Sequence, residues 1–159
     1  MTIYLDLDGV FADFSGAVQR HCPGVYYEID SKKVWETLQT IPHFFGALKR
    51  LPNSRQIYDA VIGNDQNVEF LTALPRATGL LKTAQRDKTE WVHYYIDEWV
   101  QVNCVSSWQM KKHFCLGPCD ILIDDSRRNI EDWMSVGGTG ILHVSIEDTL
   151  MQLKRLGLT

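Results

Sequence analysis

Two short apolar segments, far apart in the chain, each end in a pair of acidic residues. Residues 2–7 (TIYLDL) carry Asp6 and lead directly to Asp8, and residues 120–124 (DILID) carry Asp124 and lead to Asp125. A short segment that is apolar through its middle is typical of a strand buried on both faces. Helical patterns follow such segments along the chain, and this alternation favours a parallel sheet flanked by helices, an α/β fold. Ligands bind such sheets beyond the carboxyl ends of the strands, so the two acidic pairs are predicted to lie together.

The element boundaries can be predicted from the apolar patterns and the turn residues. We expect strands at 2–7, 68–71, 102–106, 120–124 and 141–144, and helices at 13–20, 31–40, 54–62, 89–100, 127–136 and 146–156. Ser31 and Ser54 are predicted N-caps. The helix at 89–100 would carry Trp91, Tyr95 and Trp99 on one face. Turns are expected at 65–67 and 85–87, so that Lys88 would lie just before this helix.

The segment between the first strand and Thr72 is too long for a connecting loop, at about 60 residues. We therefore assign residues 1–15 and 67–159 to an α/β core domain and residues 16–66 to a small helical cap insertion. The insertion is rich in aromatic side chains, and packing within the cap accounts for most of them. They are Tyr26, Tyr27, Trp35, His43, Phe44, Phe45 and Tyr58.

Composition excludes several classes of protein. Hydrophobic residues make up 45% of the 159 residues and charged residues 23%, enough to bury a core. The formal net charge of -4 argues against a duplex nucleic acid as partner. No apolar run approaches the roughly 20 residues that span a bilayer, and Asp6 and Asp8 interrupt the N-terminal apolar run before a signal peptide would be complete. We expect a cytoplasmic protein with no membrane partner.

Four cysteines leave two interpretations open besides free thiols. Cys22, Cys104, Cys115 and Cys119 are even in number, as disulfide-bonded cysteines are, but the chain is rich enough in core residues to need no such bonds. His113 with Cys115 and Cys119 would offer three zinc ligands at unusual spacing. We expect free buried thiols, and the sequence leaves a role for Cys115 and Cys119 open.

The acidic pairs favour a metal site. Asp6 and Asp8 are two residues apart on a strand and so point the same way, and Gly9 permits a sharp turn after them. Carboxylates that share a buried strand end repel one another unless a cation lies between them. A single Asp-x-Asp is more often a cap or a turn, but Asp124 and Asp125 at the same edge favour a cation. Mg²⁺ prefers oxygen ligands and is the expected cofactor.

Two further residues are candidates for binding phosphate. Thr72 ends the second strand, and a hydroxyl followed by free backbone N–H groups, here beginning with Ala73, suits a phosphate oxygen. Lys88 offers a compact positive charge. Taken alone, Thr72 could equally cap a helix and Lys88 could be a solvated surface residue.

The order of these residues along the chain resembles the signature of the haloacid dehalogenase (HAD) superfamily. Asp6-x-Asp8-Gly-Val comes first, then Thr72, then Lys88, then Asp124-Asp125. More narrowly, residues 6–14 (DLDGVFADF), 87–92 (DKTEWV), 120–125 (DILIDD) and the later Trp133 with 137–141 (GGTGI) resemble the 5'(3')-deoxyribonucleotidases and their bacterial and phage relatives. One departure is Ala73, because those enzymes usually have serine after the threonine.

The resemblance implies a HAD-like Rossmannoid sheet with a cap, and a role for each motif residue. Asp6 would be the nucleophile, and Asp8 would act first as acid and then as base. The side chains of Asp6 and Asp124 and the backbone carbonyl of Asp8 would hold Mg²⁺, with Asp125 in support. Thr72, the Ala73 backbone N–H and Lys88 would bind the phosphate.

The resemblance also suggests the substrate. Phe14 has the position that stacks on a nucleobase in that family, and Phe44 or Phe45 is expected to face the substrate with it. Lys111 and Lys112 fall near a basic stretch of the family and could approach the phosphate. The expected function is Mg²⁺-dependent hydrolysis of (deoxy)nucleoside monophosphates through an aspartyl-phosphate intermediate. A phosphatase for another small phosphate such as a sugar phosphate, and a non-catalytic binding module, are the alternatives. The sequence leaves open whether the chain forms a homodimer.

Overall fold

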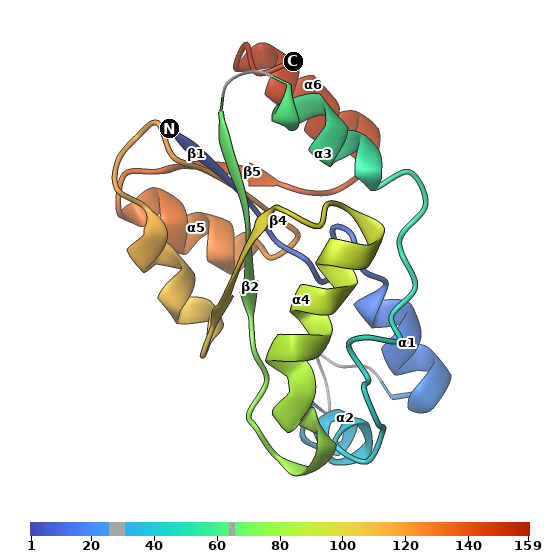
Figure 1. The fold of residues 1–159 in the computed structure, drawn as a ribbon. Coiled ribbons are helices and arrows are strands. Elements are labelled where there is room, and N and C mark those ends of the chain that lie inside the picture. Colours follow the sequence, from blue (N-terminus) through green and yellow to red (C-terminus); the bar gives the residue numbers. More distant parts are fainter. Residues whose placement is uncertain (26–30, 64–65) are drawn as a thin grey trace.

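A five-stranded parallel sheet forms the centre of the protein (Figure 1). The computed structural model describes residues 1–25, 31–63 and 66–159. The strands are β1 (Thr2–Leu5), β2 (Asn67–Ala73), β3 (Gln101–Val105), β4 (Ile121–Asp124) and β5 (Thr139–Leu142). Their spatial order is β3-β2-β1-β4-β5, and every neighbouring pair is parallel. The predicted α/β fold with five parallel strands is confirmed.

Helices cover both faces of this sheet (Figure 1). They are α1 (Phe14–His21), α2 (Ser31–Leu38), α3 (Arg55–Ile62), α4 (Ala84–Tyr95), α5 (Arg127–Ser135) and α6 (Ile146–Arg155), with short 3-10 helices η1 (Gly79–Thr83) and η2 (Trp108–Phe114). No helix in the described parts of the chain is long and apolar enough to cross a membrane.

The alternation of side chains along the central strand divides the core in two. Ile3 and Leu5 of β1 point to the face covered by α1, α3, α4 and α6, where they join the larger hydrophobic cluster. Tyr4 points to the opposite face and packs with Trp133 of α5, their ring centroids 5.4 Å apart in an edge-on arrangement. Leu122 of β4 is also on this second face. Because both faces are buried, β1 and β4 are apolar through their middle, as their sequences predicted.

The largest difference from the predicted elements concerns α4. It begins at Ala84 rather than at residue 89, the predicted turn at 85–87 is absent, and Lys88 lies within the helix. The prediction was wrong because the polar run at 85–87 was interpreted as a turn before Lys88, whereas Asp87 and Lys88 are both buried among polar partners. Buried positions of a helix are recognised in a sequence by apolar residues, and here two of the buried positions of α4 carry charges. The helix ends at Tyr95, so Trp99 lies beyond it and is 86% exposed.

Smaller differences occur at other boundaries. β5 runs over 139–142 rather than 141–144 because Thr139 pairs with Ile121. The 3-10 helix η2 was not predicted. Ser54 does not cap α3, because its hydroxyl donates to the carbonyl of Leu51. Residue 30, which precedes Ser31, lies outside the described residues, as do Tyr26, Tyr27 and Asp65.

The segment assigned to the cap makes two kinds of contact. α1 packs against α2, whereas α3 packs against α6 and β2. In α3 the Tyr58 ring lies 6.4 Å from that of Phe70 in β2. The chain between α2 and α3 is tied to the first strand's loop, since Asp13 donates its N–H to Lys49 and Leu51 donates to Phe11. α3 therefore helps to cover the sheet, and α2 lies farther out, beside α1.

Close packing around Trp133 predicts that Gly138→Ala destabilises the protein. A Cβ at Gly138 would lie 2.2 Å from Trp133 Nε1 and 2.6 Å from Cys115 Sγ, and Trp133 is fully buried. Overpacking of this kind costs about 1–3 kcal/mol of unfolding free energy. Gly117→Ala is the matched control, because a Cβ there meets no described atom within 4 Å. Equal denaturation midpoints for the two variants would contradict this account.

Candidate active site

Three carboxylates from two strand ends form an acidic cluster. Asp6 follows β1 directly, Asp124 is the last residue of β4, and Asp125 follows it. One oxygen from each carboxylate lies within 4.8 Å of the others, so the three could hold a metal ion together. Asp6 and Asp124 are buried and Asp125 is exposed. The predicted convergence of the two acidic strand ends is present, because β1 and β4 are adjacent parallel strands.

A buried lysine lies between the first two carboxylates. Lys111 Nζ, from η2, is 2.7 Å from Asp6 Oδ1 and 2.6 Å from Asp124 Oδ2. Burial raises the pKa of Asp6 to about 8, and the nearby charge of Asp124 adds to the rise while the Lys111 ammonium opposes it. Burial lowers the pKa of Lys111, but Asp6 and Asp124 outweigh this and keep it above its usual range. Lys111 therefore supplies positive charge at the acidic cluster.

Asp124 is held in place from several directions. The backbone N–H of Ser126 donates to Oδ1 at 2.8 Å, and Asn129 Nδ2 donates to Oδ2 at 2.9 Å. Ser126 also accepts the N–H of Asn129 at the start of α5. The cap of α5 and the carboxylate of Asp124 are thus one hydrogen-bonded unit, which leaves Asp124 little freedom to turn away from Asp6.

Gly9 allows the loop after β1 to approach this cluster. Its φ of +81° lies in the left-handed region, and a Cβ there would lie only 2.0 Å from Asp125 Oδ2. A side chain at this position would displace the Asp125 carboxyl group. Glycine is therefore required both for the turn and for the close approach.

A second polar group lies around Lys88. Its Nζ is 2.6 Å from Asp8 Oδ2, 2.9 Å from Thr72 Oγ1 and 2.8 Å from the carbonyl oxygen of Ala73. Asp8 Oδ1 is buried and has no hydrogen-bond partner among the described residues. Leaving such an oxygen unpaired costs about 1–3 kcal/mol, so Asp8 is poised to accept or share a hydrogen bond with a bound group.

The residue before Lys88 anchors the aromatic loop that covers it. Asp87 is buried and accepts hydrogen bonds from His43 Nδ1 at 2.9 Å and from Thr83 Oγ1 at 2.6 Å. This loop also carries Phe45, whose ring centroid lies 4.5 Å from Lys88 Nζ. The Lys88 ammonium group is therefore enclosed between its hydrogen-bond partners and the ring of Phe45.

A cavity of about 740 Å³ opens over both polar groups. Asp6, Asp8 and Asp125 contribute to its acidic end, and Phe14, Trp35 and Phe45 form an aromatic wall. Phe14 is stacked on Phe45 with ring centroids 6.3 Å apart and lies 6.0 Å from Trp35. The cavity therefore joins a charged end to a flat aromatic side.

The predicted site residues fall into three groups. Asp6, Asp8, Ala73, Asp125, Phe14 and Phe45 line the cavity. Thr72, Lys88 and Asp124 lie beneath it, connected to lining residues by the contacts above. Phe44 is buried against Phe14, Phe45 and His21 and does not line the cavity.

The sequence did not predict that Lys111 lies between Asp6 and Asp124, or that Asn129 holds Asp124. Lys111 was considered only as a residue that could approach the phosphate, because nothing predicted the 3-10 helix that turns it inward. Asn129 lies in the first turn of α5, five residues after Asp124, and that spacing after an acidic strand end was its only signal.

The alternative metal site is not assembled. In residues 1–25, 31–63 and 66–159, the side chains placed to hold a metal ion together are those of the acidic cluster. His113, Cys115 and Cys119 do not form such a group. The four cysteines are free. Cys22 is buried and Cys119 is exposed.

Comparisons with known proteins find similarity among solved structures. No protein-family model matches the sequence, and no curated protein matches it significantly. Among solved structures, a HAD family hydrolase from Deinococcus radiodurans R1, crystallised with bound phosphate and sodium, is similar with a TM-score of 0.49 and 15% identity. The match covers 96% of this chain and 87% of that one.

The charge balance of the cluster predicts a pH-dependent response to metal. Because the pKa of Asp6 in the folded protein lies above its usual value, the folded state binds more protons than the unfolded chain between about pH 4 and pH 8. Stability of the metal-free protein should therefore fall as pH rises through this range. Mg²⁺ should raise the melting temperature more at pH 8 than at pH 5, because fewer protons then compete with the ion for the carboxylates.

Thermal unfolding with and without Mg²⁺ at both pH values is the measurement. At 100 times the dissociation constant, a bound ion adds about 2.7 kcal/mol, which is roughly 5–10 °C for a chain of this size. Asp124→Asn should remove most of the Mg²⁺ effect. Metal binding by this cluster would be excluded if Mg²⁺ raised the melting temperature equally at both pH values. It would also be excluded if Mg²⁺ raised it as much in Asp124→Asn as in the wild type.

Proposed function

We propose that this chain is a Mg²⁺-dependent phosphomonoesterase of the HAD superfamily that acts on (deoxy)nucleoside monophosphates. The observation that carries the proposal is the cluster of Asp6, Asp124 and Asp125 at the end of a cavity large enough for a small ligand, with Lys111 paired to the first two. Ligands bind at this edge of a parallel sheet. The carboxylates there suit a bound cation, and that cation together with Lys111 would attract a dianionic substrate. The order of the motifs along the sequence supports the same assignment.

The proposed reaction has two steps, both at Asp6. An oxygen of the Asp6 carboxylate attacks phosphorus, and the bond to the ester oxygen breaks while Asp8 donates a proton to that leaving oxygen. Water then attacks the aspartyl phosphate, Asp8 takes a proton from it, and inorganic phosphate leaves with Asp6 restored. The covalent intermediate divides one difficult displacement into two easier ones. The unpaired Oδ1 of Asp8 is suited to this exchange of protons.

The oxygen donors of the acidic cluster fit Mg²⁺. The Asp6 and Asp124 carboxylates would hold the ion, with Asp125 and the Asp8 carbonyl in support, and the bound ion would supply the charge that lets an anionic nucleophile meet a phosphate dianion. The Asp8 carboxylate itself is engaged by Lys88. This suits a role for Asp8 in proton transfer rather than in holding metal through its side chain.

Two lysines would have different roles when the phosphate binds. Lys88 is already aligned with Thr72 and the end of β2, where the Ala73 N–H follows. Lys111 lies beside the nucleophile, so it would offset the charge that builds up as the phosphate approaches. We assign Lys88, Thr72 and Ala73 to phosphate binding and Lys111 to charge balance at Asp6.

The aromatic wall favours a nucleotide over a sugar phosphate. Phe14, Trp35 and Phe45 offer flat faces next to the acidic end, and base–aromatic stacking contributes about 1–3 kcal/mol. Residues 16–66 would act as the cap, with α1, α2 and the loop to Leu48 over the cavity and α3 fixed to the core. A sugar phosphatase with the same chemistry remains the second candidate, distinguished by a panel of both substrate types.

Asp6→Asn is expected to abolish turnover while the protein stays folded. The amide keeps the shape of the side chain and cannot attack phosphorus. The measurement is Mg²⁺-dependent phosphate release from a nucleoside monophosphate, with circular dichroism to check folding. Substantial activity in this variant would refute the covalent mechanism.

Phe14→Ala should lower catalytic efficiency selectively. If the ring stacks on the base, kcat/KM for a deoxyribonucleoside monophosphate falls about 10- to 100-fold. A sugar phosphate serves as the control substrate, because it has no base to lose. Equal losses on both substrates would mean that Phe14 acts only by packing against Phe45 and Trp35.

A further inference from the structure

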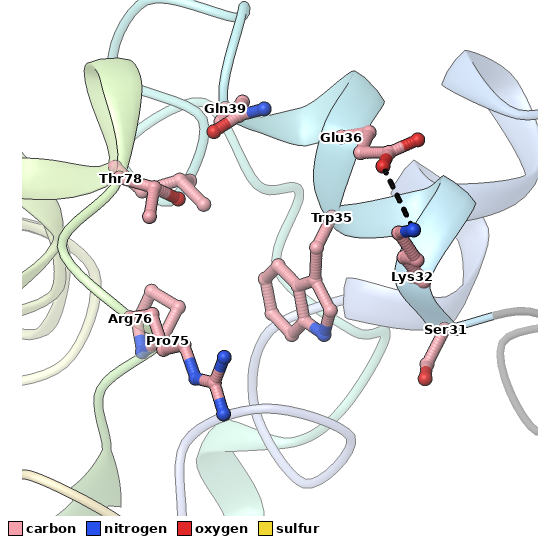
Figure 2. A pocket seen from close by; sticks show the side chains of 9 residues that line it. Ser31, Lys32, Trp35, Glu36, Gln39, Pro75, Arg76 and Thr78 are labelled. Carbon is pink, nitrogen blue, oxygen red and sulfur yellow. Dashed lines mark ion pairs between the residues drawn. The ribbon is translucent and has the colours of Figure 1, made fainter.

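The cavity at the active site continues into a second one. This outer cavity, of about 510 Å³, lies between α2 and the segment that follows β2 (Figure 2). Trp35, Pro75 and Arg76 are walls of both cavities, so the two are contiguous. Among the described residues, no carboxylate of the acidic cluster lines the outer cavity. A ligand that extends from the acidic end therefore reaches the outer cavity past these three residues.

Arg76 brings an uncompensated positive charge to this junction. In the described parts of the chain, its guanidinium has no carboxylate within 4.0 Å and no hydrogen-bond acceptor, and the residue is exposed. Arg20 is paired with Asp13 at 3.1 Å and Arg55 with Asp59 at 3.3 Å, whereas Arg76 shares with Arg155 the lack of a carboxylate partner among the described residues. The guanidinium fork of Arg76 is thus available for an anion, and it matches phosphate geometry.

The backbone around Arg76 is fixed rather than free. Pro75 restricts the chain before it, and the N–H of Thr78 donates to the Arg76 carbonyl at 2.7 Å. Leu74 donates to Val105 at 2.8 Å. A charge on such a segment has a defined position relative to the end of β2.

The other walls of the outer cavity suit an organic anion. Trp35 projects from α2 toward the segment that carries Arg76 (Figure 2). Lys32 adds a second positive charge; its partner Glu36 is 3.9 Å away and both are well exposed, which makes their ion pair weak. Charged groups of both signs and one flat ring therefore meet at this opening.

Electrostatics and reach set limits on the ligand. A second phosphate near Asp6, Asp8 and Asp125 would be repelled, so it must lie away from the acidic end. Arg76 is three residues after Ala73, which corresponds to at most about 10 Å of chain. A molecule that contacts both Ala73, at the end of β2, and Arg76 is therefore small.

We propose that Arg76 binds a second phosphate group of the substrate, so that the preferred substrate is a nucleoside bisphosphate rather than a monophosphate. The inference rests on the proposed function for the end that reacts at Asp6. With a monophosphate, Arg76 has no anion to bind. With a bisphosphate, one phosphate lies at Asp6 and the other at Arg76, and the nucleoside lies along Trp35.

Kinetics with two substrates test this assignment. Deoxyadenosine 3',5'-bisphosphate and deoxyadenosine 5'-monophosphate are compared for the wild type and for Arg76→Gln by initial phosphate release with Mg²⁺. A charge-assisted pair of this kind predicts a loss of kcat/KM of about 10- to 100-fold for the bisphosphate and little change for the monophosphate. Arg155→Gln is the matched control, since it removes the same charge from α6, which lines neither cavity.

Binding without turnover separates this inference from the reaction itself. Binding of both ligands is measured by calorimetric titration of Asp6→Asn and of the double variant with Arg76→Gln. The double variant should bind the bisphosphate more weakly and the monophosphate equally well. The inference is overturned if Arg76→Gln affects both ligands equally or neither, or if Arg155→Gln has the same effect. If the wild type hydrolyses neither substrate but the binding difference persists, the proposed function fails and the anion site stands.

Discussion

The ion pairs of Lys111 with Asp6 and Asp124 are the contact on which the site depends. Two buried carboxylates at adjacent strand ends would repel each other in a medium of low polarity, and an ammonium group 2.7 and 2.6 Å away makes their proximity possible. Removing one member of such a buried set leaves an uncompensated charge, which typically costs about 3–5 kcal/mol. The same contact joins β1, β4 and η2, so the stability of this edge and its chemistry have one origin.

The carboxylates near this contact have different hydrogen-bond partners. Asp124 is fixed by Ser126 and Asn129 at the start of α5, while Asp8 is held on one oxygen by Lys88 and left open on the other. Carboxylates that share one sheet edge thus acquire different properties from their neighbours. Such differences are what acid–base chemistry requires of a set of similar groups.

The sequence was sufficient for the parts of the structure that follow from simple periodicity. The apolar strands at Thr2 and Ile121, with acids after them, defined the sheet and the acidic edge. It was insufficient where charged residues are buried: Asp87 and Lys88 hid the start of α4, and Lys111 was recognised only as a nearby charge. Burial of a charge depends on partners distant in the chain, such as His43, Asp8 and Asp6, and no local pattern of hydrophobicity records them.

The adjacency of Asp87 and Lys88 has a consequence for how this chain can change in length. Successive residues of a helix point about 100° apart, since 3.6 residues make one turn, and here one of them holds the aromatic loop through His43 while the next holds Asp8 and Thr72. Insertion or deletion of a single residue between Gly79 and Asp87 would rotate both attachments together. Lengthening of the exposed connection after α4, around Trp99, would leave them unchanged. Insertions and deletions should therefore be tolerated unequally at the two ends of this one helix.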